Sequence, residues 1–268
     1  MKTGKLYIVA TPIGNLGDMT PRAIEVLRCV DYAYSEDTRV TGRLFKHFDI
    51  TTPLRRFDDQ TGERKIPELL ELLQAGSDLA LTSDAGTPVI SDPGMPLVTA
   101  AQDAGIEVIA VPGACAAIAA LSISGLPAHA HYFGGFLPRK AGKQQALLES
   151  LDAVDATLIF YESPHRVAST LSHLARLYPD RQAAVARELT KQHEELLRGS
   201  LSHLADDFAA RAASEDPQHA ATLKGEFVIL VAPLVARSTK RVKVDKYQHK
   251  KDLSATATEM AKAAQEQS

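Results

Sequence analysis

The sequence contains few of the residues that mark disulfide-rich, metal-binding or membrane-spanning proteins. Its 268 residues include only 2 cysteines, Cys29 and Cys115, and no tryptophan. Two cysteines so far apart provide neither a disulfide framework nor a CxxC metal site, and this low cysteine usage is typical of a reducing cytoplasm. No apolar run approaches the roughly 20 residues that a membrane-spanning helix needs, and MKTGK at the start is not followed by the apolar segment of a secretory signal. We therefore expect a cytoplasmic protein without a membrane contact or a bound metal.

An excess of positive charge is also absent. The chain has 30 Lys and Arg residues against 33 Asp and Glu residues, for a net charge of −3. Global charge therefore does not identify a nucleic-acid binder, and any RNA contact must come from a local basic surface. The apolar content of 45% and the mean hydropathy of −0.11 are those of an ordinary globular protein. At about 100–200 residues per domain, the length favours two domains.

The first part of the chain alternates strand-like and helix-like segments. Thr20-Pro21 begins one helix, because threonine is a good N-cap and proline suits the first helical position. Such alternation predicts a mostly parallel sheet covered by helices. The expected strands are 6–10, 32–35, 79–82 and 107–111, and the expected helices are 21–30, 66–74, 96–104 and a run of small residues after Pro112-Gly113.

Residues 125–139 break this alternation with glycine, proline and aromatic residues. We place a domain boundary there, which gives an N-terminal domain over 1–126 and a C-terminal domain over 127–233. The second domain is expected to be mixed α/β, with helices at 143–151, 167–177 and 201–213 and strands at 157–161, 183–186 and 226–232. The tail, 234–268, is basic and then alanine-rich, which fits either a solvated terminus or an arm that contacts phosphates.

Three loops rich in glycine and proline, 11–18, 83–94 and 112–116, follow the carboxyl ends of predicted strands. Ligands bind at this edge of an open parallel sheet, and glycine lets backbone groups approach a ligand closely. The loops contain no Walker phosphate motif and no GxGxxG dinucleotide motif, and the chain has no GxSxG or HExxH motif. His129 and His131 form an HxH pair without a nearby third ligand, so we expect them to lie in a polar inter-domain loop.

These loops also carry a resemblance to a known family. In chain order the matching segments are LYIVATPIGNLGD (6–18), SEDTR (35–39), TSDAGTPVISDPG (82–94), VPGACAA (111–117), GFLP (135–138), LIFYESPHR (158–166) and ARELTK (186–191). Together they resemble the bacterial ribosomal small-subunit RNA 2′-O-methyltransferases of the tetrapyrrole methylase superfamily, over about residues 5–233. The resemblance implies a two-domain α/β fold that binds S-adenosylmethionine between the domains, usually as a homodimer. It also implies methylation of a cytidine 2′-hydroxyl in the decoding region of 16S rRNA. The tail looks shorter than the helical module with which relatives commonly end.

The resemblance implies cofactor contacts from both domains. In the first domain they fall on the three glycine-rich loops, and in the second on the ends of predicted strands. The implied cofactor-binding residues are Pro12, Gly14, Gly86, Thr87, Pro88, Ile90, Pro112, Gly113, Ala114, Tyr161, Glu162, Arg187, Glu188, Gly225 and Glu226.

Polar residues near the same loops are candidates for catalysis and RNA binding. Asp37, Asp84 and His165 are the candidate proton acceptors, although each could instead cap a helix or a turn or hydrogen-bond locally. The candidate RNA-binding residues are Arg39, Arg43, Arg139, Lys140 and Arg166, and Arg55, Arg56 and Lys143 could extend the same phosphate-binding surface.

The residues themselves are compatible with methyl transfer. Displacement at a sulfonium needs neither a metal nor a protein nucleophile, and orientation alone supplies on the order of 7–11 kcal/mol. A general base would help to remove the hydroxyl proton, but sequence spacing does not identify it. Two alternatives stay open at this point, since fold does not determine substrate. One is a precorrin-type tetrapyrrole C-methyltransferase, and the other is a non-enzymatic RNA-binding factor in ribosome assembly.

Overall fold

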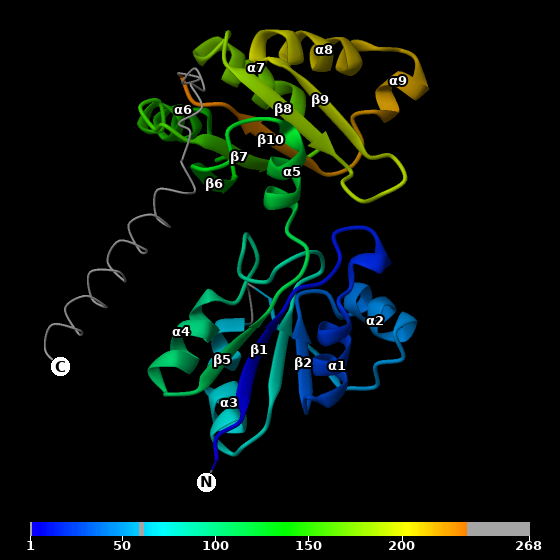
Figure 1. The fold of residues 1–268 in the computed structure, drawn as a ribbon, viewed down its shortest axis with the longest axis vertical. Helices are drawn as coiled ribbons and strands as arrows, with labels where there is room; N and C mark the ends of the chain where they lie inside the picture. The colour runs from blue at the N-terminus through cyan, green and yellow to red at the C-terminus, as the bar shows by residue number, and fades with distance from the viewer. Residues whose placement is uncertain (1, 59–61, 235–268) are drawn as a thin grey trace, which may run out of the picture. The chain divides into compact units, whose positions relative to one another are not determined.

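The computed structural model describes residues 2–58 and 62–234. Residues up to Leu234 form one compact unit with two five-stranded sheets (Figure 1). The predicted domain boundary near residue 126 therefore stays a prediction, and the predicted basic tail lies outside the described residues. None of the helices in the described part is long and apolar enough to cross a membrane.

The first sheet is entirely parallel, with the strand order β3-β2-β4-β1-β5. Its strands are β1 (Lys5–Val9), β2 (Tyr32–Ser35), β3 (Leu54–Arg56), β4 (Leu79–Thr82) and β5 (Glu107–Val111). Val9 at the end of β1 aligns with Thr82 on one side and with Val111 on the other. The carboxyl ends of the three neighbouring strands thus lie at one edge, from which the glycine-rich loops start.

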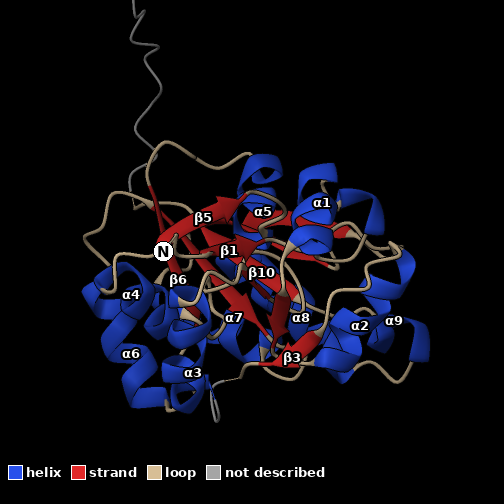
Figure 2. Cartoon of the chain, turned by 90° about the horizontal axis from the view of Figure 1, so that it is seen from below, coloured by secondary structure: helices blue, strands red, loops and turns tan. Residues whose placement is uncertain are grey.

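Helices cover both faces of this sheet because consecutive buried residues of a strand point to opposite sides. Leu79 and Leu81 pack with α3 (Gly62–Gln74) and α4 (Met95–Asp103). Ala80 packs instead with α1 (Pro21–Cys29) and α2 (Thr38–His47). Figure 1 shows α1 and α2 on the side of the sheet away from α3 and α4, and Figure 2 shows the same helices from below. The result is the two-sided, mostly parallel architecture that the alternating sequence predicts.

The second sheet is mixed, with the order β6-β7-β10-β8-β9. Only β6 and β7 run parallel, and the other neighbours are antiparallel. Its strands are β6 (His131–Phe136), β7 (Thr157–Glu162), β8 (Gln182–Arg187), β9 (Glu195–Ser200) and β10 (Phe227–Val231). The helices of this half are α5 (Ala116–Ser124), α6 (Ala141–Ser150), α7 (Val167–Leu177), α8 (Leu201–Ala213) and α9 (Pro217–Ala221). The structure confirms the predicted fold class, a parallel sheet followed by a mixed α/β half.

The two faces of the second sheet have different partners. Phe160 and Ile229 face α6, α7 and α8 in the largest buried cluster. Ile159 and Val228 face the opposite side, where they pack with α5 and with Ile13 from the loop after β1. The second face therefore meets loops of the first sheet, and it forms one wall of the cavity described below.

Most expected elements lie within a few residues of the observed ones, but five of the observed α-helices and strands were not expected. The segment of α2, TRVTGRLFKH, contains a glycine and β-branched residues, which favour helix weakly. Buried Thr41 and Phe45 hold it in place instead. Strands β3, β6 and β9 and the short helix α9 were also not predicted. In particular, His131 begins β6, so the expectation that it lies in an inter-domain loop is wrong.

Replacing Leu171 with alanine should destabilise the fold strongly, because Leu171 is fully buried between α7 and the second sheet. We expect a loss of about 2–5 kcal/mol from the free energy of unfolding in urea. Leu16→Ala is the matched control, since Leu16 is 42% exposed, and its effect should stay within about 0.5 kcal/mol. Equal losses for both variants would contradict this assignment of the core.

Candidate functional site

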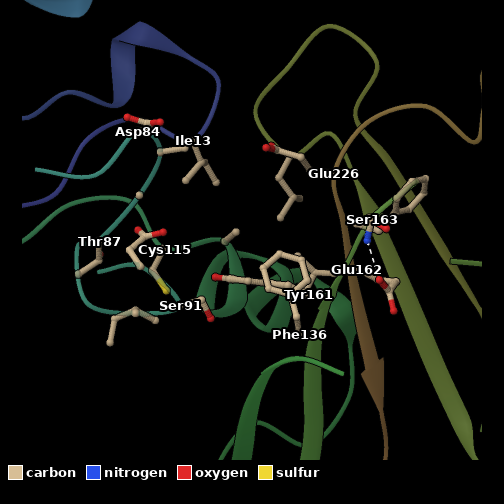
Figure 3. A pocket seen from close by; sticks show the side chains of 18 of the residues that line it. Ile13, Asp84, Thr87, Ser91, Cys115, Phe136, Tyr161, Glu162, Ser163 and Glu226 are labelled. Atoms are coloured by element: carbon tan, nitrogen blue, oxygen red, sulfur yellow. Dashed lines mark hydrogen bonds between the residues drawn. The ribbon is translucent and has the colours of Figure 1, made fainter. Parts of the chain in front are cut away.

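A cavity of about 370 Å³ lies where the loops of the first sheet meet the second sheet (Figure 3). This volume is within the usual range for small-molecule sites, about 300–1,000 Å³. The wall from the first half comes from the loops after β1, β4 and β5, and the wall from the second half comes from β6, β7, β10 and the turns beside them. The lining residues are Ile13, Asp84, Ala85, Gly86, Thr87, Ile90, Ser91, Asp92, Cys115, Ala116, Phe136, Tyr161, Glu162, Ser163, Pro164, Leu189, Glu226, Phe227 and Val228.

A pair of backbone hydrogen bonds joins the loops after β1 and β4. The Thr11 N–H donates to the Gly86 carbonyl at 2.8 Å, and the Gly86 N–H donates to the Thr11 carbonyl at 3.1 Å. The Ser83 hydroxyl also donates to the Gly86 carbonyl, at 2.9 Å. Gly86 has φ +88, and a Cβ there would lie 3.2 Å from Ile13. Glycine is therefore required at the cavity floor for both conformation and space.

Backbone strain is concentrated in two loops that border the cavity. Val89 (φ 74) and Ser91 (φ 67) lie in the loop after β4, and Glu188 (φ 48) and Thr190 (φ 66) follow β8. Positive φ is unusual for any of these residues and is a real outlier for β-branched valine. Such conformations persist only where the surroundings enforce them, and they gather at ligand sites. This strain is independent support for a functional site here.

Tyr161 connects the cavity wall to helix α5. Its hydroxyl accepts a hydrogen bond from the Ala117 N–H at 3.1 Å, which satisfies one of the free donors in the first turn of the helix. Burial raises the pKa of Tyr161 well above its ordinary value, so the hydroxyl stays neutral. Phe133 and Phe136 contact the same ring edge-on, with centroid distances of 4.9 and 5.8 Å.

A charged network fixes the far side of the cavity. The Lys191 ammonium donates to Glu188 at 2.9 Å and to Glu226 at 2.8 Å. Burial opposes ionisation of Glu188, but the hydrogen bonds from Lys191 and from the Glu226 N–H outweigh it and lower its pKa. Lys191 also lies against Gly14, where a Cβ would approach its Cγ to 2.4 Å. Gly14 thus lets the loop after β1 pack against this network.

Two carboxylates at the carboxyl edge of the first sheet have opposite environments. The Asp37 N–H donates to Asp84 Oδ1 at 3.0 Å. Burial raises the pKa of Asp84, and the nearby charge of Asp37 adds to the effect. Asp37 itself caps α2 and pairs with Arg39 at 2.6 Å, and these hydrogen bonds hold its pKa far below the usual range. Pairs whose pKa values are separated in this way are typical of acid–base sites.

The charge of the lining is one-sided. Asp84, Asp92, Glu162 and Glu226 contribute carboxylates, and no Lys, Arg or His belongs to the lining of the described cavity. Glu162 and Glu226 are paired with Arg166 and Lys191, which lie outside the lining. The half-buried carboxylate of Asp84 is the lining group that favours a ligand with positive charge. No group of three His, Cys, Asp or Glu residues in the described ranges could hold a metal ion.

The structure brings together some of the expected cofactor residues and not others. Gly86, Thr87, Ile90, Tyr161, Glu162 and Glu226 line the cavity, whereas Pro12, Gly14, Pro88, Pro112, Gly113, Ala114, Arg187, Glu188 and Gly225 do not. Several of the residues outside the lining form hydrogen bonds that hold the cavity wall in place. The Ala114 carbonyl accepts a hydrogen bond from the Thr87 hydroxyl at 3.0 Å, and Arg187 donates to the Lys224 carbonyl at 2.7 Å.

Glu162 lines the cavity but its carboxylate is already occupied. It accepts hydrogen bonds from the Ser163 N–H at 2.8 Å and from the Thr170 hydroxyl at 2.7 Å, and it pairs with Arg166 at 3.3 Å. Arg166 also donates to the Leu137 carbonyl at 2.9 Å. These contacts hold the turn between β7 and α7, which is a structural role for both side chains.

The remaining candidates differ in position. Asp84 lines the cavity, Asp37 touches it through Asp84, and His165 is exposed outside the lining. Arg39 is paired with Asp37. Arg43, Arg139 and Lys140 are exposed, and each is without an ion pair to any residue that the structure describes. They are therefore the candidate RNA contacts that the structure leaves accessible.

Six further residues line the cavity although they are not among the residues expected for the site: Ile13, Asp92, Cys115, Phe136, Leu189 and Val228. Ile13, Asp92 and Cys115 lie in the same three loops, so loop membership was the available signal. Leu189 and Val228 are apolar, so their residue types indicate core positions and not a ligand site. Phe136 lies in the segment whose strand was missed, and nothing in its spacing indicated exposure.

Comparisons with known proteins identify the family. Residues 5–205 match the family described as Tetrapyrrole (Corrin/Porphyrin) Methylases. The chain is 48% identical over 243 residues to ribosomal RNA small subunit methyltransferase I of Streptococcus pyogenes serotype M1, covering 91% of this chain and 81% of that protein. It is 50% identical over 230 residues to the protein of the same name from Synechocystis sp., covering 85% and 79%.

A solved structure supports the fold. Uroporphyrin-III C-methyltransferase from Thermus thermophilus, complexed with S-adenosylhomocysteine, superposes with a TM-score of 0.55 at 21% identity and covers 85% of this chain and 97% of that one. At this identity the likeness concerns the fold alone.

Replacing Asp84 with asparagine should stabilise the fold at neutral pH. Because burial raises the pKa of Asp84 above its ordinary value of 3.8, the folded state binds this proton more tightly than the unfolded state. The ionised group therefore destabilises the fold increasingly as the pH rises from that ordinary value through the raised one. Urea unfolding of both proteins should show a difference at pH 7 that shrinks below pH 3.8. A difference independent of pH would contradict this.

Proposed function

Because the chain belongs to the tetrapyrrole methylase family, we propose that it transfers a methyl group from S-adenosylmethionine to RNA of the small ribosomal subunit. The acceptor that we propose is the 2′-hydroxyl of a cytidine in the decoding region of 16S rRNA. The observation that carries the proposal is the acidic, glycine-floored cavity at the carboxyl edge of the first sheet, in a chain about half identical to curated rRNA methyltransferases.

The cavity fits this donor in charge and in shape. The donor carries a sulfonium, an ammonium and a carboxylate group, so its net charge is positive. The lining presents the carboxylates of Asp84 and Asp92, together with Glu226, which is paired with Lys191 at 2.8 Å. Gly86 exposes its backbone at φ +88, a conformation that strains other residues, and a Cβ there would lie only 3.2 Å from Ile13. Gly86, Thr87 and Ile90 would hold the donor from the first half, and Tyr161 and Glu226 from the second. Pro12, Gly14, Pro112, Gly113, Ala114, Arg187, Glu188 and Gly225 would keep these walls in position.

When bound, S-adenosylmethionine supplies an electrophilic methyl group, whose transfer to the 2′-oxygen breaks the carbon–sulfur bond, leaves S-adenosylhomocysteine and releases the hydroxyl proton. The chain must therefore accept a proton beside the cavity. Asp84 is the group best placed to do so, because it lines the cavity and burial raises its pKa. The Asp37 N–H orients this carboxylate through its hydrogen bond. Exclusion of water by Ile13, Leu189 and Val228 strengthens every electrostatic contact inside.

Two further properties belong to the same proposal. The protein acts in the cytoplasm and forms a homodimer, as the family resemblance implies. Gel filtration with light scattering tests the second of these, and a monomer at working concentration would contradict it.

The direct test uses small ribosomal subunits from a strain that lacks this gene. Incubation with the purified protein and S-adenosylmethionine should produce 2′-O-methylcytidine, detected by mass spectrometry of RNA nucleosides. If S-adenosylmethionine binds in calorimetry but no RNA nucleoside gains a methyl group, a tetrapyrrole C-methyltransferase becomes the better reading. If S-adenosylmethionine does not bind at all, the result favours a non-enzymatic assembly factor.

Asp84→Asn should lower kcat for RNA methylation by about 100-fold or more, because it removes the proton acceptor. The Kd for S-adenosylmethionine should change little, since the asparagine carbonyl can still accept the hydrogen bond from Asp37. Asp37→Asn and His165→Ala, measured in parallel, should lower kcat less. A larger loss in either variant would move the role of base to that residue.

Binding to small-subunit RNA should weaken steeply as salt rises, because phosphate contacts release counterions. Arg43 and Lys46 lie four and seven residues after Arg39 on α2, whose 10 residues include no acidic side chain. Replacing Arg43 or Lys46 with alanine should reduce the slope of log K against log salt by about 1 each. Arg176→Ala, on α7 across the second sheet from α5, is the control and should leave the slope unchanged. A flat response of the wild type would contradict the RNA proposal.

A further inference from the structure

Phe136 combines two properties that rarely occur together. It lines the cavity, yet 56% of its surface is exposed. The other two aromatic residues of the lining have fixed roles, since Phe227 is only 2% exposed and the Tyr161 hydroxyl is bonded to Ala117. Phe136 is thus the lining aromatic whose ring faces both the cavity and solvent, in the position that Figure 3 shows beside Tyr161.

A bulge in β6 creates this position. Phe133 pairs with Ile159 and Phe136 pairs with Tyr161, so three steps along β6 correspond to two steps along β7. In a regular strand, residues three apart would point to opposite faces. The extra residue brings both phenylalanines to the same side, where each contacts the Tyr161 ring edge-on. Bulges are known to re-aim side chains beside active sites.

Two glycines make the bulge possible. Gly135 has φ +59, and a Cβ there would lie 3.0 Å from the Ser91 hydroxyl of the strained loop after β4. A Cβ on Gly134 would approach the Phe160 ring to 2.5 Å. The backbone is therefore built to bring Phe136 up to the cavity rim while Phe133 fills the interior.

We propose that Phe136 is the platform on which the base of the methylated nucleotide stacks. The inference rests on the proposed function, because it assumes an RNA substrate. Proteins read unpaired RNA bases by stacking them on aromatic rings, and a nucleotide whose 2′-hydroxyl enters the cavity needs its base held beside the entrance. An open aromatic face at the rim of the donor cavity meets this requirement.

The surroundings favour the base of the substrate over the adenine of the donor. The donor's charged groups match Asp84 and the Gly86 backbone inside the cavity, and bound small molecules are usually buried by about 70–90%. A ring that is more than half exposed lies instead where a large substrate arrives. Arg139 and Lys140 follow three and four residues after Phe136 and are exposed, so they are available for the adjoining phosphates.

The test compares Phe136→Ala, Phe136→Leu and Phe136→Trp in full-length protein, with small subunits from the gene-deleted strain as substrate. Phe136→Ala should raise KM for the subunits by about tenfold, in line with base–aromatic stacking measured elsewhere. Phe136→Leu should behave similarly, and Phe136→Trp should restore most of the affinity. The Kd for S-adenosylmethionine should be the same in all variants. Ile123→Ala, at a residue 46% exposed on α5 and outside the cavity lining, is the matched control.

The outcomes distinguish a failure of the stacking role of Phe136 from a failure of the proposed methyltransferase function. If the wild type does not methylate subunit RNA, the proposed function fails before Phe136 is tested. If Phe136→Ala weakens S-adenosylmethionine binding and leaves KM for subunits unchanged, the ring belongs to the donor site and the inference is wrong. If Phe136→Leu matches the wild type, the contact is apolar packing without stacking, which also overturns it. Thermal unfolding of each variant identifies any loss that comes from misfolding.

Discussion

The arrangement of the site depends on the two backbone hydrogen bonds between Thr11 and Gly86. They extend the pairing of β1 and β4 beyond the sheet, in an antiparallel sense that parallel strands cannot reach without a sharp turn. Gly86 supplies the positive φ in that turn, and Val89 and Ser91 adopt strained conformations a few residues later in the same loop. The same turn places Asp84, Gly86 and Thr87 on one wall of the cavity. A local backbone constraint therefore decides which groups face the ligand.

The second half of the chain supplies what loops alone cannot. One face of the second sheet packs on α6, α7 and α8, and the other packs on α5. This packing positions Tyr161 and Val228 beside loops whose own backbone is strained. This arrangement is typical of ligand sites, in which loops contact the ligand and the helices and strands hold those loops in place.

The sequence predicted elements well where local signals and burial agree. The N-cap Thr20 and Pro21 mark the start of α1, and Thr20 does accept the Ala23 N–H at 3.1 Å. It failed for α2, where buried Phe45 overrides weak helix propensity. It also failed for β6, because an extra residue in one strand is visible only once the partner strand is known. The direction of individual side chains could not be predicted either. The glycine-rich loops were found from the sequence, but residue spacing could not show that Glu162 and Arg166 form an ion pair with each other.

The hydrogen bond from the Asp37 N–H to Asp84 ties the cavity to helix α2. Asp37 is the N-cap of that helix, and its side chain accepts the Arg39 N–H. One residue therefore joins the start of α2 to a carboxylate of the cavity lining, with its side chain bonded to the helix and its backbone amide bonded to Asp84.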